Sequence, residues 1–126
     1  MYADIKVLLV DDMDINLYLL SAQLQKIGFS SCNIIIANNG FEAIHIIENV
    51  KIDLVIVYNE MPRVNGLNLI RKMKENPKTK DIPFILNSGK PTPELIRQVL
   101  ALGASFYAKP ASINDIEKLI KKALNR

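Results

Sequence analysis

Five polar side chains follow apolar runs of the chain, and their types suit the binding of a cation and a phosphoryl group. Asp11 and Asp12 follow the first run, Tyr58 ends the third, Ser88 follows the fourth and Lys109 follows the fifth. If the runs are strands of a parallel sheet, ligands bind just outside their carboxyl ends. Carboxylates suit Mg²⁺, and a hydroxyl and an ammonium suit phosphoryl oxygens. The sequence therefore predicts one polar site at this edge.

Apolar and amphipathic segments alternate along the chain, and they would position these side chains. Short apolar runs, expected to form strands, are separated by amphipathic stretches; the runs span residues 5–10, 34–37, 54–57, 84–86 and 106–108. Such alternation is typical of an α/β fold in which helices cover both faces of a parallel sheet. The third run is apolar throughout, which predicts a buried central strand.

Helices are expected where apolar side chains recur at helical spacing. They are expected over about residues 14–27, after Gly40, over 67–75, over 93–102 and after Ser112 or Asn114. Asp14 is expected to cap the first helix and Gly28 to end it. His45 is expected on the solvent side of the second helix. It has no second histidine or matching cysteine as a partner, so no metal site is expected there.

The chain of 126 residues is expected to form one domain, residues 1–126, whose core needs no disulfide or structural metal. Its single cysteine, Cys32, is expected to be a small buried hydrophobe, which suits a reducing compartment. The sequence contains no recognisable signal peptide or membrane-spanning run. These features predict a soluble cytoplasmic protein.

The net charge of +3 comes from 16 basic and 13 acidic residues spread along the chain. The densest basic cluster lies in the last expected helix and consists of Lys118, Lys121, Lys122 and Arg126. It has no interleaved aromatic residues, which is typical of a solvated helix face rather than a nucleic-acid site. Neither nucleic acid nor a membrane is therefore expected as a partner.

Several stretches of the sequence, taken in order, resemble the receiver domain of two-component response regulators, the fold of the chemotaxis regulator. LLVDDMDINL is similar to the family's first strand and acidic pair, NNGFEAI to its NGxEAL stretch, and DLVIVYNEMPRVNG to DLVLMDxxMPxMDG. IPFILNSG and the pair Lys109-Pro110 complete the pattern, so the resemblance covers the whole chain. It implies a single-domain (βα)5 three-layer sandwich. This is a flavodoxin-like receiver fold with a parallel five-stranded sheet of order 2-1-3-4-5.

The resemblance also implies roles for the residues at the strand ends. Asp11 and Asp12 match the family's metal-binding acids, and Asp12 would be a direct ligand. Glu60 matches the position whose backbone carbonyl, not its side chain, contacts the metal. Ser88 matches the hydroxyl that senses the phosphoryl group, and Lys109 matches the ammonium that pairs with it.

An aromatic switch residue is also implied, three positions before that lysine. This position is Phe106, but only five residues separate Gly103 from Lys109 where the family usually has six. Phe106 and Tyr107 are therefore both candidates. The Lys109-Pro110 bond is cis in the family and is expected to be cis in this chain.

Tyr58 is the departure from the family pattern, because it stands where the family has its phospho-accepting aspartate. A phenol with a pKa of about 10 is neutral at pH 7, cannot form an acyl phosphate and is a poor Mg²⁺ ligand. Asp53 is no substitute, because it lies at the other end of the same strand. We therefore expect no required cofactor and only weak Mg²⁺ binding, with Lys109 paired to Asp11 or Asp12.

Simpler explanations stay open for single residues. Asp11 and Asp12 could merely favour the start of a helix. Ser88 could be a turn residue, and Tyr58 could fill a site that has decayed.

The expected function is that of a pseudo-receiver in two-component (phosphorelay) signal transduction, not an enzyme, which acts through protein–protein contacts. A histidine kinase or downstream effector would bind the fourth helix, fifth strand and fifth helix, which offer Ile96, Leu100, Lys118 and Lys122. One alternative is a decoy or scaffold that docks a histidine kinase through the first helix without phosphotransfer. Another is a small flavodoxin-like enzyme or nucleotide-binding domain. It is disfavoured because the chain lacks GxGxxG and GxxxxGK motifs and has no Ser-His or Cys-His set.

Overall fold

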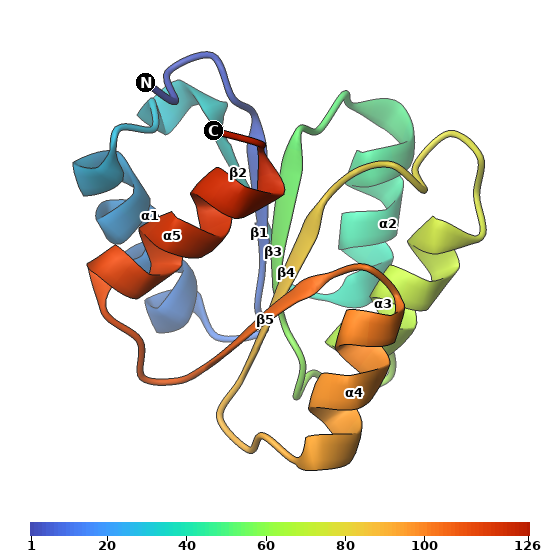
Figure 1. Cartoon of the computed structure of the whole chain (residues 1–126). Coiled ribbons are helices and arrows are strands. Elements are labelled where there is room, and N and C mark those ends of the chain that lie inside the picture. Colours follow the sequence, from blue (N-terminus) through green and yellow to red (C-terminus); the bar gives the residue numbers. More distant parts are fainter.

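The third strand along the chain lies at the centre of a parallel sheet. The computed structural model describes residues 1–126. In it β3 (Leu54–Tyr58) pairs with β1 (Val7–Val10) on one side and β4 (Phe84–Ser88) on the other. The outer strands are β2 (Ile34–Ala37), beside β1, and β5 (Ser105–Ala108), beside β4. The order β2-β1-β3-β4-β5 confirms the predicted fold (Figure 1).

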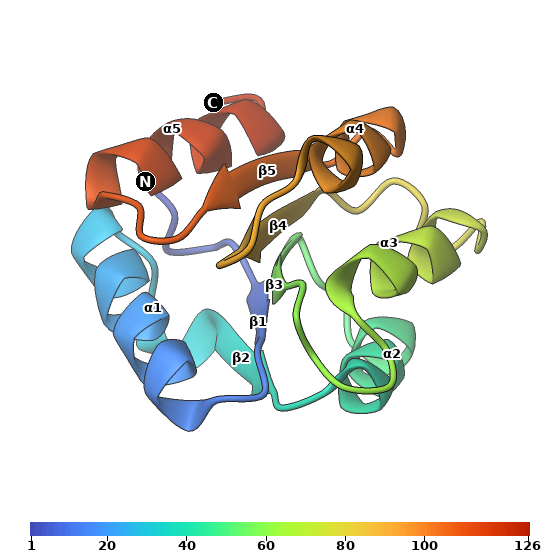
Figure 2. The same cartoon turned by 90° about the horizontal axis from the view of Figure 1, so that it is seen from below.

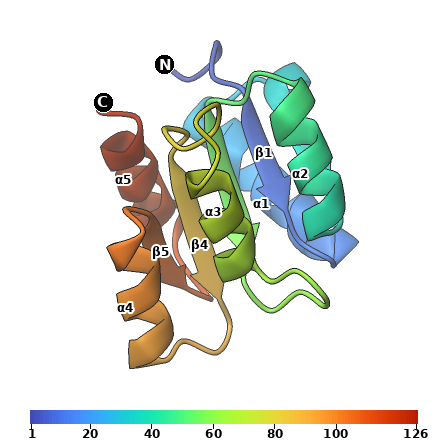
Figure 3. The same cartoon turned by 90° about the vertical axis from the view of Figure 1, so that its right-hand side faces the viewer.

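Five helices cover the two faces of this sheet. α1 (Asp14–Ile27) and α5 (Ile113–Ala123) pack on one face. α2 (Gly40–Asn49), α3 (Gly66–Lys74) and α4 (Pro93–Ala101) pack on the other, which faces the viewer in Figure 3. Figure 2 looks along the sheet and shows the two helical layers with the strands between them. Because all five strands are parallel, their carboxyl ends lie at the same edge of the sheet.

Alternate strand residues fill two separate cores. On β1, Leu8 and Val10 belong to the core under α2, α3 and α4, whereas Val7 and Leu9 belong to the core under α1 and α5. The first four residues of β3 are each at most 1% exposed, which confirms a buried central strand. Complete burial of such a side chain contributes about 1.5–3 kcal/mol. A shift of the strand pairing by one residue would move the side chains of each core to the opposite face of the sheet. The register of the strands, and with it the position of their ends, is therefore fixed.

Capping side chains begin four of the five helices. Each cap accepts a hydrogen bond from the backbone N–H three residues on, and the caps are Asn39, Asn65, Thr92 and Ser112. The exception is α1, whose cap position is Met13, so the prediction that Asp14 caps this helix is wrong. The Asp14 carboxylate instead accepts a 2.8 Å hydrogen bond from the Asn38 amide. Gly28, with φ of 130°, ends α1 as predicted.

Cys32 is exposed, so the prediction that it is a buried hydrophobe is wrong. It lies in the 3₁₀ helix Ser31–Asn33, just before β2. Its Sγ atom is 3.1 Å from the Ser30 hydroxyl. Because its neighbours are polar and form a surface turn, Cys32 has no apolar surroundings to pack against.

The histidine and the basic residues that were expected on the surface of two helices are exposed. His45 is exposed, and so are the four basic residues expected on the solvent face of the last helix: Lys118, Lys121, Lys122 and Arg126. None of the helices combines the length and apolar composition that crossing a bilayer requires.

Candidate functional site

Lys109, at the end of β5, connects the polar side chains of three strands. Its Nζ atom donates to Asp11 Oδ2 over 3.3 Å and lies 4.2 Å from the centroid of the Tyr58 ring. The first contact is an ion pair and the second is a cation–π interaction. Lys109 is therefore held between the residue that follows β1 and the residue that ends β3.

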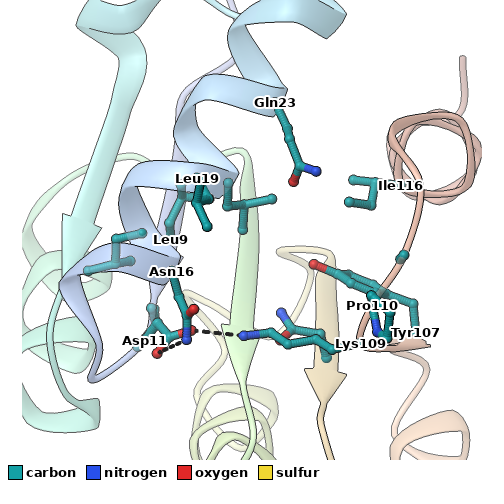
Figure 4. A pocket seen from close by; sticks show the side chains of 14 residues that line it. Leu9, Asp11, Asn16, Leu19, Gln23, Tyr107, Lys109, Pro110 and Ile116 are labelled. Atoms are coloured by element: carbon teal, nitrogen blue, oxygen red, sulfur yellow. Dashed lines mark hydrogen bonds and ion pairs between the residues drawn. The ribbon is translucent and has the colours of Figure 1, made fainter.

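Asp11 is the acidic partner of this lysine and is only 6% exposed. Its Oδ1 atom accepts hydrogen bonds from the Met13 N–H at 3.0 Å and the Asn16 amide at 3.4 Å. Figure 4 shows the bonds to Asn16 and Lys109. The hydrogen bond from Met13 lies at the start of α1, where a carboxylate is favoured. Asp12, by contrast, is exposed, and of the two predicted partners for Lys109 the structure selects Asp11.

Tyr58 is half-buried beside Lys109, and its pKa is raised above the ordinary value of 10.0. Burial is the main cause, followed by the negative charges of Glu60 and Asp11 and a hydrogen bond to Glu60. All of these disfavour the phenolate. The hydroxyl therefore remains protonated at neutral pH.

The Glu60 side chain, rather than its backbone alone, belongs to the site. Oε2 accepts hydrogen bonds from the Ser88 hydroxyl at 2.7 Å and the Asn59 amide at 2.9 Å. Oε1 accepts one from the Gly89 N–H at 2.9 Å. Burial by itself would raise the pKa of this carboxyl, but the hydrogen bonds from Ser88, Asn59, Gly89 and Tyr58 outweigh it and lower the pKa. From the sequence, Glu60 was expected to act only through its backbone carbonyl, and these side-chain contacts were not predicted.

The loop after β3 is held in place by Asn59. Its Oδ1 atom accepts from the Leu67 N–H at 3.1 Å, and its carbonyl accepts from the N–H groups of Met61 and Gly66. Gly66 lies so close that a Cβ there would be 3.0 Å from both Asn59 Cα and the Tyr58 carbonyl. This packing presents the Glu60 carboxylate to the end of β4.

The two candidate switch aromatics face opposite sides of the sheet. Phe106 packs against the core under α2, α3 and α4, whereas Tyr107 packs against the core under α1 and α5. Phe106 is therefore the aromatic on the α4 side. The Lys109-Pro110 peptide bond that follows is cis, as predicted.

A cavity of about 250 Å³ adjoins the site between α1 and α5. Leu20, Asn87, Tyr107 and Ile116 are among the residues that line it, and Figure 4 shows the lining side chains. Asn87 is 3% exposed, and its Oδ1 atom has no hydrogen-bond partner. Burial and the nearby charge of Asp11 raise the pKa of Tyr107, so its hydroxyl is protonated. This cavity was not predicted from the sequence.

Replacing Asn87 with leucine is expected to stabilise the protein by about 1 kcal/mol, because a buried acceptor without a partner is removed at similar side-chain size. Urea unfolding followed by circular dichroism measures the change. A matched substitution, Tyr2→Phe, removes the other buried atom without a partner, the Tyr2 hydroxyl. A loss of stability on Asn87→Leu would contradict this prediction, because it would mean that the Asn87 amide makes a stabilising hydrogen bond inside the cavity.

Glu60 is expected to make folding stability depend on pH. Its pKa in the folded protein lies below the ordinary value of 4.5. The stabilisation is therefore present above about pH 4.5 and is lost as the pH falls through the folded pKa. Glu60→Gln should destabilise the protein more at about pH 7 than at about pH 3, as measured by urea midpoints. An equal loss at both pH values would contradict the assignment.

Few groups of this site are free to bind a metal ion. Asp11 already accepts from three donors, and the Glu60 carboxylate from at least three. Asp12 and the Glu60 carbonyl remain as oxygen ligands on the protein. No group of three or more Asp, Glu, His or Cys side chains gathers in a way that could hold a metal. This donor set fits a tightly bound cation poorly, because Mg²⁺ sites use carboxylates that are free to ligate.

The sheet order and the strand-end site define a doubly wound α/β domain of the flavodoxin-like class, with its polar site at the carboxyl edge. The family model described as response regulator receiver domain matches residues 7–121. The chain therefore belongs to this family, as the resemblance of its motifs indicated.

Relatives and solved structures agree with this assignment. The chain is 33% identical to the two-component response regulator ARR17 of Arabidopsis thaliana, over 99% of this chain and 88% of that protein. It is 32% identical to a probable chemotaxis protein CheY of Rhizobium etli, over 93% and 90% of the two chains. The signal receiver domain of a DNA-binding response regulator from Colwellia psychrerythraea superposes with a TM-score of 0.86 at 27% identity, over 98% and 100% of the two chains. These similarities support signal transduction with other signalling proteins as partners.

Proposed function

We propose that this chain is an atypical receiver that is not phosphorylated on aspartate and acts through protein–protein contacts. The observation that carries the proposal is Tyr58 at the carboxyl end of the central strand, in contact with Lys109. A neutral phenol at this place cannot form an acyl phosphate. Asp53, at the opposite end of β3, accepts a 2.9 Å hydrogen bond from the Lys6 N–H and is remote from the site. The chain would then have no catalytic activity of its own.

Weak Mg²⁺ binding is part of this proposal. The Lys109 ammonium pairs with Asp11, so it compensates the charge that a cation would otherwise neutralise. Asp12 is left as the one exposed carboxylate of the pair. If Mg²⁺ binds, Asp12 and the Glu60 carbonyl would hold it, and most of its ligands would be water.

The surface formed by α4, β5 and α5 is the proposed contact region for a signalling partner. Leu100 on α4 is 57% exposed, Ile96 and Phe106 are partly buried, and Lys118 and Lys122 on α5 are exposed. An apolar centre flanked by charge is typical of a transient protein interface. Phe106, on the α4 side, would connect this surface to the strand ends.

A second candidate, a decoy or scaffold that docks a histidine kinase without phosphotransfer, is favoured by the start of α1. Four large apolar side chains are more than half exposed there: Met13, Ile15, Tyr18 and Leu19. Exposed apolar patches of this kind mark protein contacts. Competition with a phosphorylatable receiver for a histidine kinase, repeated with Tyr18→Ala and Leu19→Ala, would test this role.

The decisive experiment is exposure of the purified protein to acetyl phosphate or beryllofluoride with Mg²⁺. Intact mass and amide NMR shifts near Asp12, Ser88 and Lys109 provide the readout. We expect no adduct and no shifts for the natural sequence or for Tyr58→Phe. Tyr58→Asp should show both a phosphoryl adduct and amide shifts. An adduct on the natural sequence would mean that another residue accepts phosphate, and the proposal would be wrong.

A further inference from the structure

The Glu60 carboxylate joins two loops that are far apart in the sequence. Glu60 lies in the loop between β3 and α3, whereas Ser88 and Gly89 lie where β4 passes into the loop before α4. The two bonds between them, 2.7 Å from the Ser88 hydroxyl and 2.9 Å from the Gly89 N–H, use one carboxylate oxygen each. Both are charge-assisted hydrogen bonds, which are shorter and stronger than neutral ones.

The donors around this carboxylate form an anion-binding site. A hydroxyl, a backbone N–H and the side-chain amide of Asn59 converge on it. All three donors are uncharged, so a single negative charge suits them. The Lys109 ammonium is paired with Asp11 instead. An external carboxylate or phosphate would need the same Ser88 and Gly89 donors that Glu60 already uses.

The contact also reaches the start of α4. The Ser88 Oγ atom, which donates to Glu60, accepts a 3.0 Å hydrogen bond from the Lys90 N–H. Two residues further on, Thr92 caps α4 through its bond with the Leu95 N–H. The conformation of the first part of this connection, from Ser88 to Lys90, is thereby tied to the position of one carboxylate.

We propose that Glu60 is a built-in anionic ligand, which permanently holds the β4–α4 connection in one arrangement. This inference rests on the proposed function, because a receiver without aspartyl phosphate needs another group to set this connection. The protein would accordingly present one constant state of the α4 surface to its partners, and added phosphate would not change it.

Amide NMR of the full chain tests the proposal, with Glu60→Ala, Glu60→Gln and the control Glu48→Ala, whose side chain is exposed in the last turn of α2. A bond to a carboxylate moves an amide proton downfield. We expect the Gly89 amide proton to move upfield in both Glu60 variants and not in the control. Millimolar acetate or inorganic phosphate should return it downfield in Glu60→Ala, by filling the vacated position, and should leave the natural sequence unchanged.

Two results would overturn the proposal: unchanged Gly89 and Lys90 resonances in both Glu60 variants, or an equal response of the natural sequence and Glu60→Ala to added anion. Glu60→Gln keeps the side-chain size, so the test stands even if Glu60→Ala folds poorly. The proposed function fails separately, through a phosphoryl adduct on the natural sequence by intact mass. The Gly89 shifts of the Glu60 variants do not depend on that assay.

Discussion

Tyr58→Asp is expected to lower the free energy of unfolding by about 1–3 kcal/mol without metal, and to raise Mg²⁺ affinity about tenfold or more. The new carboxylate would join Asp11, Asp12 and Glu60 at the same strand ends, where like charges repel. The cation–π contact of Lys109 with the ring, at 4.2 Å, would also be lost. A divalent cation would then have four carboxylates nearby and would relieve the repulsion.

Urea unfolding with and without Mg²⁺ measures both effects, because a ligand that binds only the folded state stabilises it. Tyr58→Phe is the matched control, since it removes the hydroxyl but adds no charge. Mg²⁺ should stabilise Tyr58→Asp clearly and the other two proteins little. If Mg²⁺ stabilised the natural sequence as strongly as Tyr58→Asp, the residue at position 58 would not control metal binding.

Lys109→Met should destabilise the protein by about 2–3 kcal/mol, because it leaves Asp11 as a buried charge without its ion-pair partner. The Asp11 side chain is 8% exposed and that of Lys109 is 31% exposed. The loss should be smaller than for a fully buried pair, because Met13 and Asn16 still donate to Asp11.

Lys121→Met is the control for this substitution. It breaks a 3.9 Å pair with Glu117 on the surface of α5, where the side chains are 47% and 30% exposed. Such a pair contributes about 0–1 kcal/mol. Asp11→Asn combined with Lys109→Met should recover part of the loss in a double-mutant cycle. An equal loss of unfolding free energy for Lys109→Met and Lys121→Met would show that the Lys109–Asp11 pair stabilises the protein no more than a surface pair does.

Local patterns in the sequence predicted most of the fold. The bounds of α1 were predicted at Asp14 and Ile27, because the leucine spacing and Gly28 are signals contained within one helix. The strand runs and their order followed from apolar composition and from the family motifs. Two predictions were wrong: that Asp14 caps α1 and that Cys32 is buried. Both rested on residue type alone, but the neighbouring groups decide whether a side chain caps a helix or is buried in the core.

The sequence by itself determined which chemical groups lie at the strand ends, since strand length and alternation place Asp11, Tyr58, Ser88 and Lys109 there. It could not determine which of these groups bond to one another. Glu60 contacts Ser88 across 28 residues of chain, and Lys109 contacts Asp11 across 98. Such contacts depend on side-chain direction and burial, which are set only when the layers pack together. The tertiary structure therefore decided that Asp11 rather than Asp12 pairs with Lys109, and that Glu60 supplies the anion at Ser88.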